Sequence, residues 1–155
     1  MNTIESDIAE KYLSRLKERC MVNTYESDLN QTYEYSKNIL FFILEYKKPE
    51  SLKHLTFARL KSISSFDDNS NIGKFKLTLS ILTDERVNIL LEFFEAHDIN
   101  SDESVVFNFE EISDFIINKK FINPFTEEEI SEFEFSKMIT TFFSVSDELL
   151  GDLNV

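Results

Sequence analysis

Two loops of this 155-residue chain carry short oxygen-bearing side chains at a spacing that suits a divalent cation. The first loop runs from Asp98 through Asn100 to Asp102, with an oxygen ligand at every second position. The second loop covers residues 67–71, where DDNSN repeats this alternation 31 residues earlier. Calcium prefers carboxylate and amide oxygens supplied by one loop. Asp98, Asn100 and Asp102 are therefore the candidate metal ligands.

The first loop resembles the calcium loop of an EF-hand, which also needs glycine at its sixth position and a bidentate glutamate at its twelfth. Those positions hold Glu103 and Phe109 here, and in the second loop they hold Ile72 and Thr78. Asp and Asn side chains in loops commonly accept hydrogen bonds from the backbone of their own turn. We therefore expect turn formation, and a degenerate calcium-responsive module remains an alternative function.

The residues needed for most catalytic chemistry are missing or isolated. The chain has two glycines, Gly73 and Gly151, so neither a phosphate-binding loop nor a dinucleotide fingerprint can be written. Cys20 lies on the apolar face of an expected helix with no histidine nearby, and His54 and His97 lack metal-ligand spacing. We expect a protein without catalytic residues and without a cofactor.

The negative charge of the chain is concentrated toward its C-terminal half. The net charge is −13, and it divides into −2 over residues 1–50, +3 over residues 51–82 and −14 over residues 83–155. A field of this kind repels nucleic acid and anionic lipid and attracts basic proteins, mainly through the association rate. The charge pattern thus favours a surface that binds a basic partner.

The candidate partner-binding residues are the carboxylates of two acidic segments of this half. They are Glu127, Glu128, Glu129, Glu132 and Glu134, together with Asp98, Asp102 and Glu103 from the nearby loop. Toxin-immunity proteins and DNA-mimicking anti-restriction proteins are similar in this style of composition. The principal hypothesis is a non-catalytic, immunity- or antitoxin-like module that binds and inhibits a basic protein, such as a nuclease toxin or a nucleic-acid-binding protein. A DNA mimic is an alternative.

A group of basic residues in the middle of the chain offers a further alternative. These residues, on an expected helix followed by an expected strand, are Lys53, Arg59, Lys61, Lys74 and Lys76. A helix and strand with such a footprint are faintly similar to a winged-helix DNA reader acting through residues 53–76. Five basic residues beside a net charge of −14 make direct nucleic-acid binding the weaker expectation.

Neither a membrane span nor a secretory signal is expected. The longest apolar run, Ile39 to Leu44, has six residues, whereas a span needs about 20. The N-terminal segment MNTIESDIAEKY has early acids and no apolar core of a signal peptide. The single cysteine, Cys20, allows no intramolecular disulfide and fits a reducing compartment. We therefore expect a cytoplasmic protein that does not bind membranes.

Apolar spacing predicts two helices at the start of the chain. A row at four-residue spacing marks one face of the first helix and consists of Ile4, Ile8, Tyr12, Leu16 and Cys20. The second helix is expected to begin near Ser27 or Asp28, either of which can cap it, and to end before Pro49. Its last part, ILFFIL, is apolar all round and is therefore expected to be buried.

The rest of the chain is expected to form strands in the middle and helices toward the end. Residues 50–65 favour a helix over a strand, residues 66–73 a loop, and the alternation at 75–81 a strand. Thr83 is expected to cap a helix whose apolar face consists of Val87, Leu90, Leu91 and Phe94, and a short strand is expected over 105–107. Capping-box spacing predicts helices over 109–118 and from Thr126 to about residue 143, with fraying thereafter.

These elements together predict a single α+β domain over residues 1–155 that is mostly helical. Five or six helices accompany a small two- or three-stranded antiparallel sheet in the middle of the chain. The expected layout is a helical hairpin over residues 3–48, a strand-containing region over 50–108 and acidic helices over 109–150.

Overall fold

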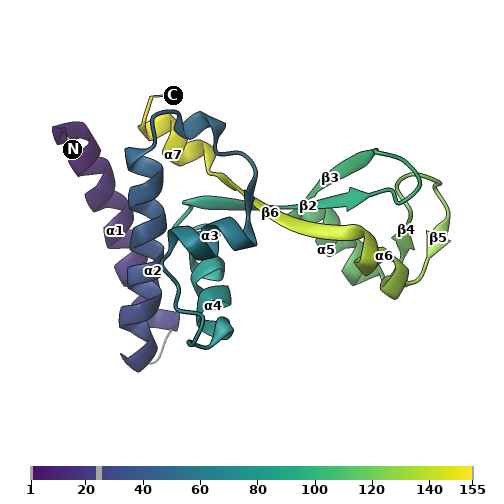
Figure 1. Ribbon diagram of the computed structural model, residues 1–155, viewed down its shortest axis with the longest axis horizontal. Helices are drawn as coiled ribbons and strands as arrows, with labels where there is room; N and C mark the ends of the chain where they lie inside the picture. The colour runs from purple at the N-terminus through teal and green to yellow at the C-terminus, as the bar shows by residue number, and fades with distance from the viewer. Residues whose placement is uncertain (1, 24–25, 155) are drawn as a thin grey trace. The chain divides into compact units, whose positions relative to one another are not determined.

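The computed structural model describes residues 2–23 and 26–154, and it confirms a mostly helical α+β fold (Figure 1). The α-helices of the described residues are α1 (Thr3–Asn23), α2 (Glu26–Glu45), α3 (Phe57–Ile63), α4 (Ile72–Leu82), α5 (Phe109–Asn118), α6 (Glu132–Met138) and α7 (Asp147–Asp152). A 3-10 helix, η1 (Pro49–Ser51), follows α2. No helix in this part of the chain is long and apolar enough to cross a membrane.

The strands form a four-stranded antiparallel sheet and a separate two-stranded pair. Their bounds are β1 (Leu55–Thr56), β2 (Leu90–His97), β3 (Ser104–Asn108), β4 (Phe121–Ile122), β5 (Glu129–Ile130) and β6 (Ile139–Val145). The larger sheet has the order β1-β6-β2-β3, and β4 pairs with β5. The described chain thus has more strands and more helices than the sequence patterns predict.

The chain divides into two compact units. Unit 1 comprises residues 1–91 and 144–155, and unit 2 comprises residues 92–143. The boundaries fall inside β2 and β6, so each of these strands contributes residues to both units. They also cut across the expected regions 50–108 and 109–150. The expectation of a single domain remains a prediction.

The first two helices of unit 1 follow the apolar pattern. Ile8 and three further members of the α1 row are buried, with Tyr12, Leu16 and Cys20 fully inaccessible, while Ile4 is 63% exposed. Helix α1 packs along α2, and α2 packs along α4. Four of the six ILFFIL residues are buried, as expected for the end of α2. The expected caps of α2, Ser27 and Asp28, lie outside the described side chains.

The strand expected over residues 75–81 is wrong, because this segment belongs to α4. The Asn71 side chain accepts a hydrogen bond from the Gly73 N–H and caps the helix. Phe75, Thr78 and Leu79 form part of its buried face at helical spacing. Thr78 conceals this pattern in the sequence, because threonine is a polar residue and yet is buried here. Its hydroxyl donates to the backbone carbonyl of Lys74, one turn earlier (2.9 Å), which makes the burial possible.

The helix expected from Thr83 through residues 87–94 is also wrong. Thr83 is the C-cap of α4, its hydroxyl donates to the Leu79 carbonyl, and β2 begins at Leu90. Strand β2 lies inside the sheet, between β6 and β3. Its residues Leu90, Leu91 and Phe94 happen to fall at helical spacing, and the pairing that makes them a strand involves residues far away in the sequence.

The long helix expected from Thr126 is replaced by three elements: β5, α6 and β6. The capping box exists but lies five residues later, where Ser131 accepts from the Glu134 N–H and Glu134 accepts from the Ser131 N–H. By contrast, α5 has its expected bounds and its expected Asn108 cap, and β3 contains the expected strand. Residues 50–65 combine both candidate structures, the short strand β1 and then α3.

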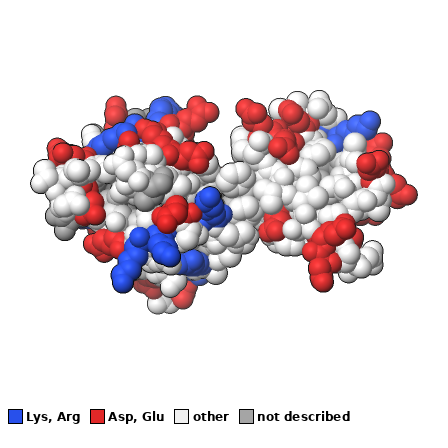
Figure 2. All heavy atoms as spheres, turned by 90° about the horizontal axis from the view of Figure 1, so that it is seen from above, with Lys and Arg blue, Asp and Glu red and all other residues white. Residues whose placement is uncertain are grey.

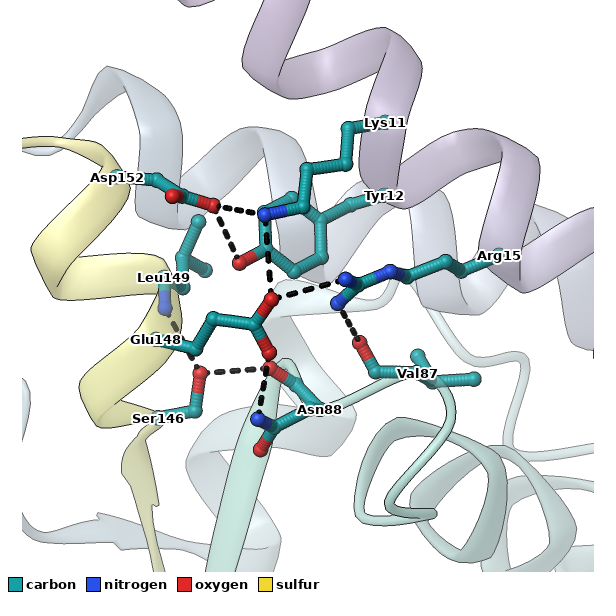
Figure 3. A network of polar contacts seen from close by, with 9 residues as sticks. All are labelled: Lys11, Tyr12, Arg15, Val87, Asn88, Ser146, Glu148, Leu149 and Asp152. Carbon is teal, nitrogen blue, oxygen red and sulfur yellow. Dashed lines mark hydrogen bonds and ion pairs between the residues drawn. The ribbon is translucent and has the colours of Figure 1, made fainter.

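The C-terminal segment was expected to fray, but it forms α7 and is joined to α1 by polar contacts (Figure 3). Lys11 forms ion pairs with Asp152 (2.6 Å) and Glu148 (3.1 Å), and Arg15 forms one with Glu148 (2.8 Å). The hydroxyl of the buried Tyr12 donates to Asp152 (2.8 Å). Each helix supplies its charges at positions four residues apart, so both charges lie on one helix face.

The same network includes the loop before β2. The Asn88 side-chain amide donates to Glu148 (2.7 Å), and the Ser146 hydroxyl donates to the Asn88 carbonyl (2.6 Å). Hydrogen bonding by Arg15, by Asn88 and by Lys11 lowers the pKa of Glu148 from 4.5 to about 2. The folded state therefore favours the ionised carboxylate, and unit 1 gains stability from it above the unfolded pKa.

Helix α5 ends at a residue in the left-handed conformation. Lys119 is its C-cap, with φ of 50°. This conformation costs a residue with a Cβ about 1 kcal/mol relative to glycine.

We predict that Lys119→Gly stabilises the protein by about 0.5–1 kcal/mol, because it removes this steric cost. Denaturant unfolding followed by helical circular dichroism measures the change. Lys119→Ala removes the same charge and keeps the Cβ, so it is the matched control. Equal stability of the two variants would show that the backbone conformation is not the cause.

We predict that Glu148→Gln destabilises the protein by about 1 kcal/mol at pH 7, a modest figure because solvent screens a side chain that is 35% exposed. The folded pKa of Glu148 is depressed, so its contribution is lost as the pH falls from about 4.5 toward 2. Thermal unfolding at pH 7 and pH 3 should show a smaller difference between variant and parent at the lower pH. Glu10→Gln, an exposed change on α1, is the control and should alter neither value. A pH-independent difference would contradict the assignment.

Candidate partner-binding surface

The helices of unit 2 pack against one face of its strands. The core cluster joins Ala96 and Phe107 of the sheet to Ile112 of α5, Phe121 of β4 and Phe135 of α6. The Phe135 ring lies 5.2–5.3 Å from the rings of Phe115 and Phe121, measured between centroids. This aromatic cluster holds α5, α6 and the β4–β5 pair on the same side of β2 and β3.

The opposite face of these strands carries a different set of side chains. Glu95 and His97 of β2 stand opposite Val106 and Ser104 of β3 in the antiparallel register. Among them, Val106 is 51% exposed. His97 Nε2 lies 3.3 Å from the Thr140 hydroxyl of β6, and 3.6 Å from a Glu95 carboxylate oxygen. This face therefore mixes polar side chains with the apolar Val106, whereas the core face is aromatic and apolar.

The negative charge of the protein is segregated by unit. Unit 2 has thirteen acidic and three basic side chains, a net of −10, whereas unit 1 has sixteen acidic and thirteen basic, a net of −3. Figure 2 shows red Asp and Glu side chains spread over unit 2, at the right of the view, while most of the blue Lys and Arg side chains lie on unit 1. The expected acidic half is thus mainly a property of unit 2.

All five carboxylates predicted at residues 127–134 are exposed, but turns and a short helix position them. Glu127 and Glu128 lie in the turn between β4 and β5, where Asn123 donates its N–H to the Glu128 carbonyl (2.8 Å). Glu129 begins β5, so these three are not the first turn of a helix as predicted. Glu132 and Glu134 do lie in the first turn of α6.

The predicted residues of the other loop lie between β2 and β3. Asp98 accepts hydrogen bonds from the Asn100 N–H (3.1 Å) and the Ser101 hydroxyl (2.9 Å), as expected for a turn-forming carboxylate. Asp102 and Glu103 are exposed at the start of β3. No group of three His, Cys, Asp or Glu side chains in the described part of the chain is arranged to hold a metal ion. The hydrogen bonds support the turn interpretation for the Asp98 side chain.

The basic residues of the winged-helix alternative lie on unit 1 but lack the expected strand. Lys74 and Lys76 are on α4, and Lys74 donates to the Gln31 side chain (2.7 Å). Lys61 of α3 forms an ion pair with Asp68 (2.7 Å). Arg59 and Lys53 are exposed. Several of these charges therefore already have partners within the protein.

The sequence patterns do not reveal that unit 2 exposes large apolar side chains among its acids. These are Ile99, Val106, Phe109, Ile116, Ile117 and Phe133, each more than half exposed. The sequence of α5 gives no such signal, because four of its five apolar residues fall at the spacing of a single buried helix face: Phe109, Ile112, Phe115 and Ile116. An acidic surface with exposed apolar residues can bind a protein through both charge and desolvation.

Burial raises the pKa of two groups that lie outside the acidic loops. Burial raises the pKa of the Cys20 thiol to about 11, which disfavours the reactive thiolate. Burial also raises the pKa of Glu92, the first residue of unit 2. The polar groups joining α1 and α7 contact one another, which is typical of a structural network.

Comparison with known proteins gives no assignment. No protein-family model, curated protein or solved structure matches this chain.

Proposed function

We propose that the protein is a non-catalytic interaction module whose unit 2 binds a basic surface of a partner protein and thereby inhibits that partner. The observation that carries this proposal is the segregation of charge, with a net of −10 on unit 2 against −3 on unit 1. A charge that served solubility alone would have no reason to gather on the smaller part of the chain. Concentrated charge of one sign raises the association rate with an oppositely charged partner.

The local structure supports a surface of fixed shape. Asn123 accepts through its side chain from the Phe125 N–H and holds the turn that presents Glu127 and Glu128. Ser131 caps α6 directly before Glu132. Turns and caps fix the backbone at these positions, so binding costs little further backbone entropy, and the remaining cost is that of ordering the Glu side chains.

The proposal includes a cytoplasmic location. Cys20 is a buried thiol in the core beside α2, and a reducing compartment preserves it. The partner class consists of basic proteins, including nucleases and nucleic-acid-binding proteins, because those proteins carry basic substrate grooves.

The test uses a variant of unit 2 with reduced negative charge and a matched variant of unit 1. The first variant replaces Glu127, Glu128, Glu129, Glu132 and Glu134 with Gln, which keeps side-chain size and can still form the α6 capping box. The second replaces five exposed acids of unit 1, Asp7, Glu10, Glu18, Glu45 and Glu50, with their amides. Both variants change the net charge by the same amount.

We predict that a partner captured from host lysate at low salt associates with the unit 2 variant about tenfold more slowly, and with a weaker salt dependence. The unit 1 variant should associate nearly as fast as the parent. Stopped-flow or biosensor association rates at two salt concentrations provide the measurement. Equal losses in the two variants, or no loss in either, would rule out a specific role for unit 2.

A further inference from the structure

Strand β3 lies at an edge of the four-stranded sheet. The sheet order places β2 on one side of it and no described strand on the other. The register with β2 is regular from the pair Phe93–Asn108 to the pair His97–Ser104. An edge strand presents backbone N–H and C=O groups on its free side, and these groups can pair with an extended segment of another protein.

Three features by which proteins often prevent such pairing are absent from β3 itself. Its sequence, SVVFN, contains neither lysine nor proline, and five consecutive pairs with β2 leave no bulge. Ser104, Val106 and Asn108 are exposed. The strand is thus regular over its length, and every second residue of it is exposed.

Acidic pairs lie at both ends of this edge. Asp102 and Glu103 directly precede β3, and Glu110 and Glu111 follow its end after one residue. All four are exposed. Five residues of strand span roughly 16 Å, so a bound segment of similar length would place its own two ends near these carboxylates. The complementary segment has β-branched or apolar residues in its middle and lysine or arginine at both ends.

We propose that the basic partner binds by adding such an extended segment to the free edge of β3. The inference rests on the proposed function and specifies how unit 2 would bind its partner. A second copy of this chain is the poorer occupant, because pairing two edges of β3 would bring together two units that each carry a net charge of −10.

The probe is a synthetic nine-residue peptide, Lys-Lys-Val-Thr-Val-Thr-Val-Lys-Lys. Its control is the same peptide with every central backbone nitrogen methylated, which removes the backbone donors and keeps the charge. Binding to the full-length protein is measured by titration at low and high salt. Hydrogen exchange of the Ser104–Asn108 amides is followed with and without peptide. We expect the unmethylated peptide to bind at least about tenfold more tightly, since several backbone hydrogen bonds are at stake, and to slow exchange at alternate amides of β3.

A pair of protein variants separates edge pairing from charge. Val106→Lys places a lysine on the exposed edge, and Ile117→Lys makes the same charge change on α5, where the side chain is 75% exposed. Edge pairing predicts that Val106→Lys weakens binding of the unmethylated peptide several-fold more than Ile117→Lys does. Unchanged circular dichroism of both variants shows that they are folded.

Equal binding of the two peptides, with unchanged exchange in Ser104–Asn108, would overturn strand addition and leave charge-driven binding by unit 2 intact. Failure of both peptides to bind would also overturn strand addition. The proposed function itself fails by a different result, the equal behaviour of the unit 1 and unit 2 amide variants toward the captured partner.

Discussion

The constraint that shapes unit 1 is that its two segments are far apart in the sequence and must meet, and the ionic contact between α1 and α7 is one place where they do. Unit 2 interrupts unit 1 in the sequence, so unit 1 must be assembled from two distant segments. Glu148 and Asp152 of the later segment contact Lys11 and Arg15 of the earlier one. Each contact is partly exposed and modest alone, but shared partners reduce the entropy that each ion pair must overcome. This network holds α7, which follows β6, against α1.

Apolar spacing and capping residues predict correctly those helices whose formation depends on residues close together in the sequence. Helix α1 follows from its four-residue apolar row, and α5 follows from the Asn108 cap and the helical spacing after it. The pattern of α4 predicts a strand instead, because one buried position is the polar Thr78, whose hydroxyl donates to the carbonyl of the preceding turn. Binary apolar patterns treat such a threonine as exposed, and here that error exchanged a helix for a strand.

The central strands could not be predicted from local pattern, because their burial depends on partners far along the chain. Strand β2 pairs along one edge with β6, which begins 42 residues after β2 ends. The acidic residues of the candidate surface were predictable from charge alone, but their positions on turns were not. The free edge of β3 was also hidden from the sequence, since the order of strands decides which of them has an unpaired side.

The divided layout of unit 1 sets an order of events during synthesis. Every residue of unit 2 lies in one continuous stretch, and all of that stretch leaves the ribosome before Glu148 and Asp152 do. During this interval Lys11 and Arg15 have no ionic partners on α7, and the Tyr12 hydroxyl has no carboxylate to donate to. A nascent chain thus carries an incomplete N-terminal unit for most of its translation. Apolar surface that is exposed during this time is prone to aggregation. The helices made first are the last to be completed.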